Sequence, residues 1–343
     1  MIKRNKVTIY DIAEQAGVSI GTVSRVLKGS ANVKPATRAK IEEVIARCNY
    51  QPSAVARGLT QSHTHTLGII LPKLTNPNYV KIFEGAYDEA AANGYVMMLF
   101  PWENMNAAGQ DIVEVLGERR LDGVIICLEF IANEMEKWRR KLDAIQQYMP
   151  VVLTGSMPQA LEYPSVTNDL AERTAQTIQM LAERGHERIA LLGGFDESDA
   201  PYSRDAGYAR GLQAAHLPYI REYRQFGLCT IDDGARQFET MLSQLLPSQW
   251  PTAVIAANDL VGVGVMRAAQ ARGLRVPEDM SVIGCDNIFI CDCVQPPLTS
   301  VCTHQSETGR LAVRMLLGLE ESGRRMMPCE MIERGSCCER KKV

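Results

Sequence analysis

The chain has 343 residues, 46% of them hydrophobic and 22% charged, so it is long enough for two or three folded domains. No run approaches the roughly 18 apolar residues that a membrane span needs, and no apolar stretch follows the charged N-terminus as a secretion signal requires. We therefore expect a cytoplasmic protein with no membrane partner. Residues 1–60 hold ten Lys and Arg against four Asp and Glu, although the whole chain has a net charge of −3. Residues 1–60, called the head, therefore have a net charge of +6, and the rest of the chain, called the body, has a net charge of −9. This contrast predicts that the head alone contacts the phosphates of DNA.

The first predicted helix lies between Thr8 and Gly17. Thr8 is a favourable N-cap, and the acidic Asp11 three positions later makes a weaker form of the capping box. Gly17 accepts the left-handed backbone that ends a helix. The apolar residues of this segment are spaced i, i+3, i+4 and i+7 and share one face: Ile9, Ile12, Ala13 and Ala16.

A second predicted helix begins at Ser19, which caps it, and a third opens at Lys34–Pro35 and runs to about Cys48. The second helix turns valines inward and presents Ile20, Gly21, Ser24 and Arg25 outward. Two short helices joined by a glycine turn are typical of a helix-turn-helix, whose second helix enters the major groove of DNA. The alternative is a generic three-helix domain with a solvated basic face.

After residue 66, short apolar runs alternate with helical stretches. The runs predict strands at Leu67–Leu71, Tyr95–Phe100, Gly123–Cys127, Val151–Thr154, Arg188–Leu192, Ala253–Ala256 and Ser281–Cys285. Helices are predicted at Tyr79–Asn93, Asp169–Arg184, Ser203–Ala215, Asp259–Arg272 and Thr303–Leu319. This alternation predicts parallel sheets with helices on both sides. We expect two such units, divided near residue 160 and crossing back near residues 290–300, with a ligand cleft at the carboxyl ends of the strands.

No motif in the body demands catalysis, a cofactor or a metal. The segment Gly262–Arg267 approaches a dinucleotide fingerprint, but it lacks the third glycine and falls inside a predicted helix. Ten cysteines occur without a C-x-x-C pair, and the five histidines show no ligand spacing, so we expect mostly free thiols. A redox or metal role for Cys291 and Cys293, or for Cys337 and Cys338, is the alternative.

Over essentially its whole length the chain resembles the lactose-repressor (LacI/GalR) family of transcription regulators. The head motif is V-T-I-Y-D-I-A-E-Q-A-G-V-S-I-G-T-V-S-R-V-L at residues 7–27, and the hinge motif is Asn49–Leu59. Motifs in the body are Thr75–Tyr79, Ala257–Asp259, Val276–Asp279, Val282–Asn287 and Pro296–Val301.

The resemblance implies an all-α helix-turn-helix head, residues 1–60, and a linker, residues 61–66. It also implies an α/β two-lobed body with parallel sheets, residues 67–343, similar to periplasmic binding proteins, that binds an effector and dimerises. The homodimer would read a near-palindromic DNA operator. Implied DNA contacts in the head are Thr8, Tyr10, Ser19, Ile20, Gly21, Thr22, Ser24, Arg25, Asn32 and Thr37. Arg25 is the best base reader among them, because its fork matches O6 and N7 of guanine.

Residues 53–59 resemble the family's hinge helix, which orders only on DNA. Ser53 can cap it, Ala56 lets two copies approach closely, and Leu59 is the expected wedge in the minor groove. A plain flexible linker is the alternative at this position.

Effector contacts implied by the resemblance are Asn78 and Tyr79 in the first lobe and Arg204, Asn258 and Asp286 in the second. The alternatives are a helix cap for Asn258 and a surface ion pair for Arg204. We therefore expect a dimeric repressor, not an enzyme, controlled by a small molecule between two lobes. A sugar or sugar phosphate is the first candidate, a nucleobase the second and a partner protein the third. A solute-binding receptor is the main alternative from another class.

Overall fold

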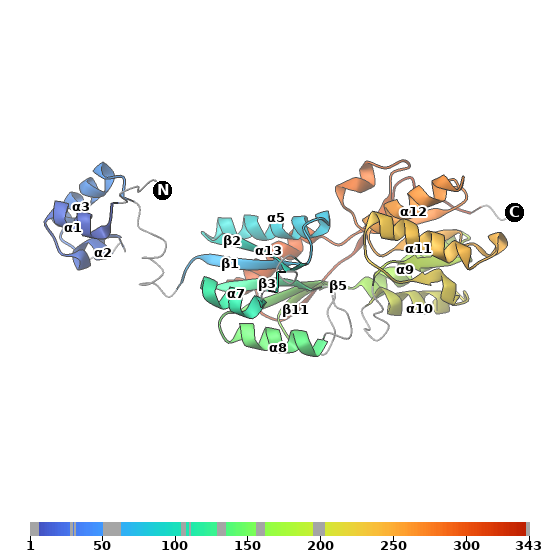
Figure 1. Cartoon of the computed structure of the whole chain (residues 1–343), viewed down its shortest axis with the longest axis horizontal. Coiled ribbons are helices and arrows are strands. Elements are labelled where there is room, and N and C mark those ends of the chain that lie inside the picture. Colours follow the sequence, from blue (N-terminus) through green and yellow to red (C-terminus); the bar gives the residue numbers. More distant parts are fainter. Residues whose placement is uncertain are drawn as a thin grey trace. The chain divides into compact units, whose positions relative to one another are not determined.

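The computed structural model describes residues 7–27, 30, 32–50, 63–103, 108–109, 111–128, 135–155, 162–194 and 203–340. It separates the chain into two compact units, Met1–Thr64 and His65–Val343 (Figure 1). The predicted hinge contacts Ser53, Ala56 and Leu59 lie outside the described residues. Each unit is described by itself.

The head contains three helices, α1 (Ile9–Ala16), α2 (Ile20–Leu27) and α3 (Pro35–Arg47). Thr8 and Asp11 form a complete capping box, and Gly17 ends α1 with a φ of 63°. Ser19 Oγ accepts the Thr22 N–H at 3.3 Å, as expected of a cap. Apolar side chains from all three helices form one buried cluster, which includes Ile12, Ala16, Val23, Val26, Ile41 and Val44. The predicted helix-turn-helix is confirmed in these elements.

The first lobe of the body is built on a six-stranded parallel sheet with the order β11-β5-β4-β3-β1-β2. Its strands are β1 (Thr66–Leu71), β2 (Val96–Pro101), β3 (Gly123–Leu128), β4 (Val151–Gly155), β5 (Ser165–Asn168) and β11 (Arg324–Met327). One face packs on α7 (Ile112–Arg119) and α8 (Met135–Gln146), and the other packs on α5 (Pro77–Ala92) and α13 (Gln305–Leu316). Figure 1 shows these helices on opposite sides of the sheet.

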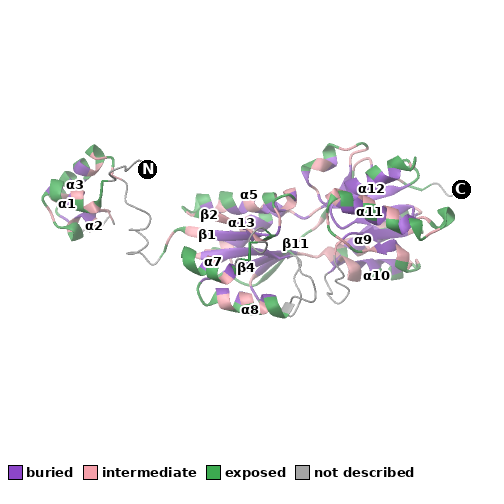
Figure 2. Cartoon of the chain, viewed as in Figure 1, coloured by how far each residue is buried: buried purple, intermediate pink, exposed green. Residues whose placement is uncertain are grey.

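The second lobe repeats this plan with the strand order β12-β10-β9-β8-β6-β7, in which only β12 is antiparallel to its neighbour. Its strands are β6 (Ile189–Leu192), β7 (Arg224–Gln225), β8 (Ala253–Ala256), β9 (Ser281–Asp286), β10 (Thr299–Cys302) and β12 (Glu330–Ile332). The covering helices are α9 (Leu170–Glu183), α10 (Arg204–Ala214), α11 (Ile231–Ser243) and α12 (Asp259–Ala271). In Figure 2 the residues coloured as buried concentrate along both sheets. The predicted fold class is confirmed.

The chain passes between the lobes at places that differ from the sequence prediction. It leaves the first sheet after β5, at residue 168 rather than near 160, and it returns after Cys302 rather than near 290–300. A third crossing, between β11 and β12, was not predicted. The cause is strand length, because β5, β10, β11 and β12 have only three or four residues each, and β11 begins with two exposed arginines. Two crossings are tied together by Asn168 Nδ2, which donates to Thr303 O at 3.1 Å.

Glycines let the paired helices of the body approach closely. A Cβ on Gly264, in α12, would lie 2.0 Å from the carbonyl oxygen of Ile231 in α11. A Cβ on Gly85, in α5, would lie 1.9 Å from the carbonyl oxygen of Ser306 in α13. The glycines of the Gly262–Arg267 segment therefore serve packing inside a helix, which agrees with the rejection of a dinucleotide fingerprint there. Among the described residues no helix is long and apolar enough to cross a membrane.

Candidate functional site

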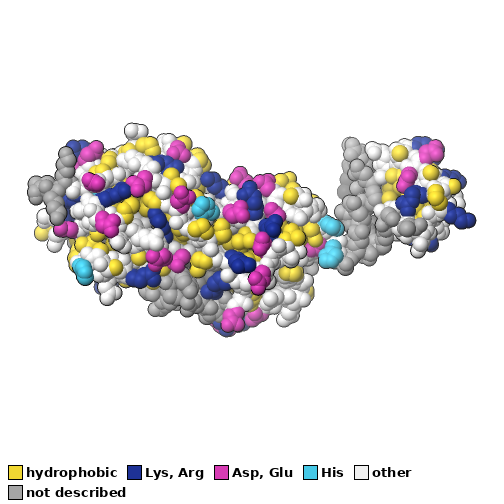
Figure 3. All heavy atoms as spheres, turned by 180° about the vertical axis from the view of Figure 1, so that it is seen from behind, with side chains coloured by type: hydrophobic (Ala, Val, Ile, Leu, Met, Phe, Trp, Pro, Cys, Tyr) yellow, Lys and Arg dark blue, Asp and Glu magenta, His cyan; other side chains and the backbone are white. Residues whose placement is uncertain are grey.

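The exposed side of α2 is the candidate DNA-contact surface of the head. Val23 and Val26 fill the core, so the opposite side of the helix is presented to solvent. On that side Ser19, Ile20, Gly21 and Arg25 are exposed, while Thr22 and Ser24 are half-buried. Tyr10, Thr8 and Asn32 are also exposed, and Thr37 is half-buried. The face drawn in Figure 3 shows Lys and Arg on the head and charges of both signs mixed across the body.

Several of these side chains, Thr8 and Arg25 among them, already have partners in the free head. Thr8 Oγ1 donates to Asp11 Oδ2 at 2.7 Å, and the Thr8 backbone N–H donates to the same oxygen at 2.7 Å. These bonds hold the pKa of Asp11 below its usual value. Arg25 Nε donates to the Gly21 carbonyl at 3.2 Å, one turn earlier on α2. Thr8 thus has a structural role as a cap, and its predicted DNA contact stays a prediction.

In the body, all five predicted effector residues line one cavity between the two sheets. Asn78 and Tyr79 come from α5, and Arg204, Asn258 and Asp286 come from the second lobe. The cavity volume is about 140 Å³. It has room for on the order of ten water-sized groups, about the size of a monosaccharide or a nucleobase. Although these residues are far apart in sequence, the structure brings them together at the carboxyl ends of the strands.

The first lobe offers the cavity an acceptor without a partner. Asn76 caps α5 by accepting the Asn78 N–H at 3.0 Å, which fixes the start of the helix at the cavity wall. The side-chain oxygen Oδ1 of Asn78 is buried and accepts no hydrogen bond from any described residue. Because a buried polar atom without a partner is costly, this oxygen is a strong candidate to accept a hydrogen bond from a ligand. Tyr79, only 7% exposed, adds a ring to the same wall.

The second lobe supplies charged and amide groups. Arg204 is the first residue of α10 and donates through Nη2 to Cys285 Sγ at 3.8 Å. Asn258 caps α12, because its Oδ1 accepts the Val261 N–H at 2.9 Å, and its Nδ2 donates to the Cys229 carbonyl at 3.2 Å. The cap therefore occupies the Asn258 oxygen, and the second N–H of its amide is the group that can face a ligand.

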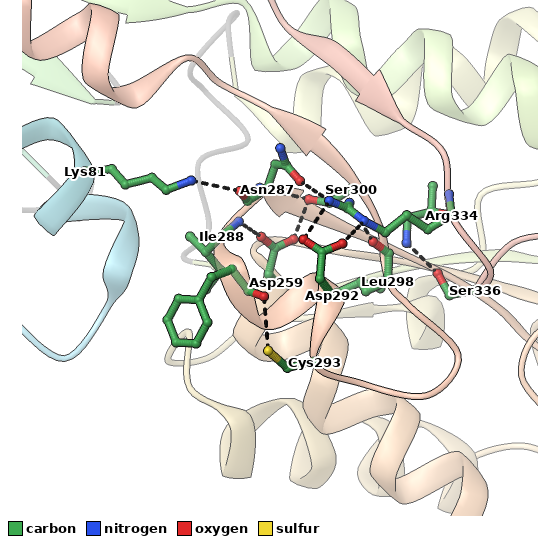
Figure 4. A network of polar contacts seen from close by, with 12 residues as sticks. Lys81, Asp259, Asn287, Ile288, Asp292, Cys293, Leu298, Ser300, Arg334 and Ser336 are labelled. Atoms are coloured by element: carbon green, nitrogen blue, oxygen red, sulfur yellow. Dashed lines mark hydrogen bonds and ion pairs between the residues drawn. The ribbon is translucent and has the colours of Figure 1, made fainter. Parts of the chain in front are cut away.

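Asp286 ends β9 in an unusual backbone conformation. Its φ is 103°, and the following Asn287 has a φ of 52°, in the region that non-glycine residues rarely adopt. Figure 4 shows the contacts around this corner, which come from Asp259, Ser300 and Arg334. Asp286 is 7% exposed and lines the cavity.

Sequence reasoning missed a buried ion pair in the cavity wall. The side chain of Arg224 is 3% exposed and forms an ion pair with Asp205, whose Oδ2 accepts from Nη2 at 3.1 Å. Arg224 Nη1 also donates to the carbonyls of Gly193 at 2.9 Å and Gln225 at 2.6 Å. Arg224 and Asp205 both line the cavity. The only signal in the sequence was a charged residue inside the run Tyr223–Phe226, which is too short and polar to be read as a strand.

Cysteine and histidine groups give no metal site among the described residues. All ten cysteines are free thiols, as expected, and three of them, Cys127, Cys285 and Cys291, are buried. Burial raises the pKa of Cys127 to about 12, which keeps it a neutral thiol.

Two family models match the chain in complementary regions. The model of bacterial regulatory proteins of the lacI family matches residues 8–53, which include α1, α2 and α3. The model of a periplasmic binding protein-like domain matches residues 178–337. The first match lies within the head and the second within the body.

Relatives and solved structures extend the likeness over nearly the whole chain. Catabolite control protein A of Priestia megaterium is 35% identical over 90% of this chain and 91% of its own. The HTH-type transcriptional repressor CytR of Escherichia coli strain K12 is 30% identical over 96% of both. A lac repressor dimer bound to operator and the anti-inducer ONPF superposes with a TM-score of 0.83, at 28% identity over 97% of this chain and 100% of that one. The regulator CelR in complex with cellobiose has a TM-score of 0.68, at 28% identity over 96% and 99%.

Proposed function

The chain belongs to the lacI family of bacterial regulatory proteins, and we propose that it is a dimeric repressor controlled by a small neutral sugar or sugar derivative. Family membership makes it a DNA-binding transcription regulator with an effector-binding body, which is not an enzyme. The proposal adds that the protein represses transcription, that it acts as a dimer and that its effector is a neutral sugar or sugar derivative. Ligand in the cleft would change lobe closure and hence the spacing of the two heads on an operator.

The observation that carries the proposal is the convergence of Asn78, Tyr79, Arg204, Asn258 and Asp286 on one cavity. A polyol suits this wall, because each hydroxyl can both donate and accept. It could donate to the unpartnered Asn78 Oδ1 and accept from Arg204 and the Asn258 amide. A relative of known structure supports this class, since the regulator CelR was solved in complex with cellobiose.

The charges in the cavity wall favour a neutral effector over a sugar phosphate. The charged lining residues are Arg204, Asp205, Arg224 and Asp286, two of each sign, and no lysine is among the described residues of the lining. Arg224 is paired with Asp205, so the charged groups that remain to face a ligand are Arg204 and Asp286, whose charges cancel. A phosphate would bring two negative charges to a wall with no net positive charge.

A nucleobase is the second candidate, and the aromatic content of the cleft argues against it. Tyr79 is the sole aromatic side chain among the described lining residues. A flat base would therefore have a stacking partner on one side only. A sugar can place one ring face against this single aromatic side chain and take its other contacts through hydroxyl groups.

The DNA-binding part of the proposal is tested by selecting operators from random duplexes and measuring affinity by fluorescence anisotropy at two salt concentrations. We expect a near-palindromic site whose affinity falls steeply with salt, because the head acts through phosphate contacts. Binding without sequence preference, or without salt dependence, would be incompatible with the proposal. Analytical ultracentrifugation of the free protein and of the complex decides whether the dimer is the binding species.

A further inference from the structure

The corner that follows β9 lies at the carboxyl end of a fully buried strand and has two consecutive residues with positive φ, Asp286 and Asn287. Neither is glycine, so neither adopts this backbone readily. Conformations of this kind persist only where surrounding contacts hold them, and they cluster at ligand-binding positions. The residues that hold the corner therefore bear on how Asp286 is presented to the cleft.

Asp259, at the start of α12, holds the Asp286–Asn287 corner through hydrogen bonds. It is the first residue of α12, it is fully buried, and its Oδ2 accepts the backbone N–H of Ile288 at 2.8 Å. Its Oδ1 accepts the hydroxyl of Ser300, and that hydroxyl oxygen accepts the backbone N–H of Asn287 at 3.0 Å. One carboxylate thus anchors two successive amides, one directly and one through a serine (Figure 4).

Arg334 holds the same corner from the C-terminal segment. Its Nη2 donates to Asn287 Oδ1 at 2.9 Å, and its Nε donates to Asp292 Oδ1 at 2.7 Å. Its Nη1 donates to the Leu298 carbonyl at 3.1 Å. With its side chain fixed by Arg334 and its N–H fixed by Ser300, Asn287 has little freedom to turn its own carbonyl.

That carbonyl is directed at the other lobe. Lys81 Nζ, on α5, donates to the Asn287 oxygen at 3.4 Å, and Figure 4 shows the lysine reaching across to it. Lys81 lies three residues after Asn78, so both project from the same side of the helix that forms the first-lobe wall of the cleft. The Lys81 backbone carbonyl in turn accepts the Ser306 hydroxyl at 3.3 Å, next to the crossing into α13. The contact therefore joins the lobes beside the effector cavity, and Lys81 is not among the residues that line it.

We propose that Asp259 is a positioning residue for effector binding, because it holds the Asp286–Asn287 corner so that Asp286 faces the ligand while the Asn287 carbonyl contacts Lys81 of the opposite lobe. Lys81 is then a closure contact that stabilises the ligand-bound arrangement without touching the ligand. The inference rests on the proposed function for the existence of an effector, but the geometry of the corner is independent of it.

The first experiment measures single-amide hydrogen exchange in the full-length free protein. Asp259→Asn should speed exchange of the Asn287 and Ile288 amides by at least about tenfold, because Ile288 loses its charged acceptor and the Ser300 hydroxyl that accepts from Asn287 loses the carboxylate that fixes it. Asp233→Asn is the matched control, since Asp233 is also buried near a helix N-terminus of the same lobe and accepts from Thr230. It should leave both amides unchanged. Equal protection in wild type and Asp259→Asn would overturn the proposal.

Ser300→Ala separates the two anchors if Asp259→Asn fails to fold. It removes the acceptor of the Asn287 amide and leaves the bond from Ile288 to Asp259 in place. We expect faster exchange at Asn287 with protection retained at Ile288. Equal loss of protection at both amides, or loss at neither, would contradict the arrangement in which Ser300 links the Asn287 amide to Asp259.

The second experiment measures binding of D-glucose, D-ribose and cellobiose by calorimetry. Lys81→Met should weaken binding of a probe sugar about fivefold, the value of one net hydrogen bond, and Lys81→Arg should restore it. Lys73→Met is the control, because Lys73 pairs with Glu103 within the first lobe at 2.9 Å. Wild-type affinity in Lys81→Met would refute the closure contact. If none of the sugars binds the wild-type protein, the proposed effector class is wrong, and the exchange experiment still decides whether Asp259 holds the Asp286–Asn287 corner.

Discussion

The buried ion pair between Arg224 and Asp205 provides the sharpest stability test of the cleft wall. Arg224 is 3% exposed and Asp205 is 12% exposed at the side chain, and the pair lies where β7 meets the first turn of α10. Arg224→Met would keep much of the aliphatic volume and remove the charge. It would leave the Asp205 carboxylate without its counter-ion and the carbonyls of Gly193 and Gln225 without this donor.

Removing one partner of a buried pair costs about 3–5 kcal/mol, because the remaining charge stays largely desolvated. That loss is a large part of a typical unfolding free energy of about 5–15 kcal/mol. The double variant Arg224→Met/Asp205→Leu removes both charges, so we expect most of the loss to be recovered. The assay is equilibrium urea unfolding of the full chain, followed by tryptophan fluorescence and by circular dichroism.

The control for this prediction is the ion pair of Arg210 with Glu172, at 2.9 Å, which joins α10 to α9 in the same lobe. Both of its side chains are about half exposed. Arg210→Met should therefore cost about 1 kcal/mol or less. If Arg224→Met cost no more than Arg210→Met, the argument from burial would be wrong.

Three further predictions concern the head, the helix packing and pH. Arg25→Ala should cost about 1–3 kcal/mol on the selected operator and relax discrimination at one base pair, as measured by anisotropy; full retention of the guanine preference would contradict its role as a base reader. Gly264→Ala should destabilise the body by about 1–3 kcal/mol in urea unfolding, because its methyl would meet the Ile231 carbonyl, whereas Gly117→Ala in α7 has open space and should be neutral or stabilising. Burial lowers the pKa of His186, so below about pH 6.5 the unfolded state takes up a proton that the folded state resists. The unfolding free energy should therefore be intact above that pH and fall as the pH drops toward the lowered pKa; a melting temperature with the same pH dependence in His186→Gln as in wild type would contradict this.

Local patterns predicted the elements whose signals are local. The capping box of Thr8 and Asp11 and the stop at Gly17 could be anticipated because caps depend on residues three or four positions apart. The long buried strands β1, β3 and β9 were equally visible, since each is a continuous apolar run. Predicted ends of these elements are correct to within one residue.

The elements that link the lobes could not be read in the same way. β11 has the sequence Arg-Arg-Met-Met and is mostly exposed, so only its pairing with β5 makes it a strand. Crossing points depend on such pairings between distant segments, which explains why the predicted boundaries near 160 and 290–300 were displaced.

The candidate cleft was anticipated through family motifs, and its supporting residues were not. The resemblance pointed to Asn78, Asn258 and Asp286, and the structure brings them to one cavity. Arg224 and Asp259 act through contacts with residues distant in the sequence. Arg224 pairs with Asp205, and Asp259 accepts hydrogen bonds from Ile288 and Ser300. No single-sequence signal distinguishes a buried, fully bonded charge from an exposed one, so these roles required the fold.

The central claim is that a neutral sugar in the cleft sets the affinity for DNA. The direct measurement is the operator Kd by anisotropy, with and without D-glucose, D-ribose, cellobiose and glucose 6-phosphate, in wild type and in Asn78→Ala. At least one neutral sugar should change the wild-type Kd by about fivefold or more, the scale of a typical allosteric coupling, and glucose 6-phosphate should not. Asn78→Ala should bind the operator with wild-type affinity and lose the response, because the unpartnered Oδ1 is gone. No response to any neutral sugar, or an unchanged response in Asn78→Ala, would contradict the account.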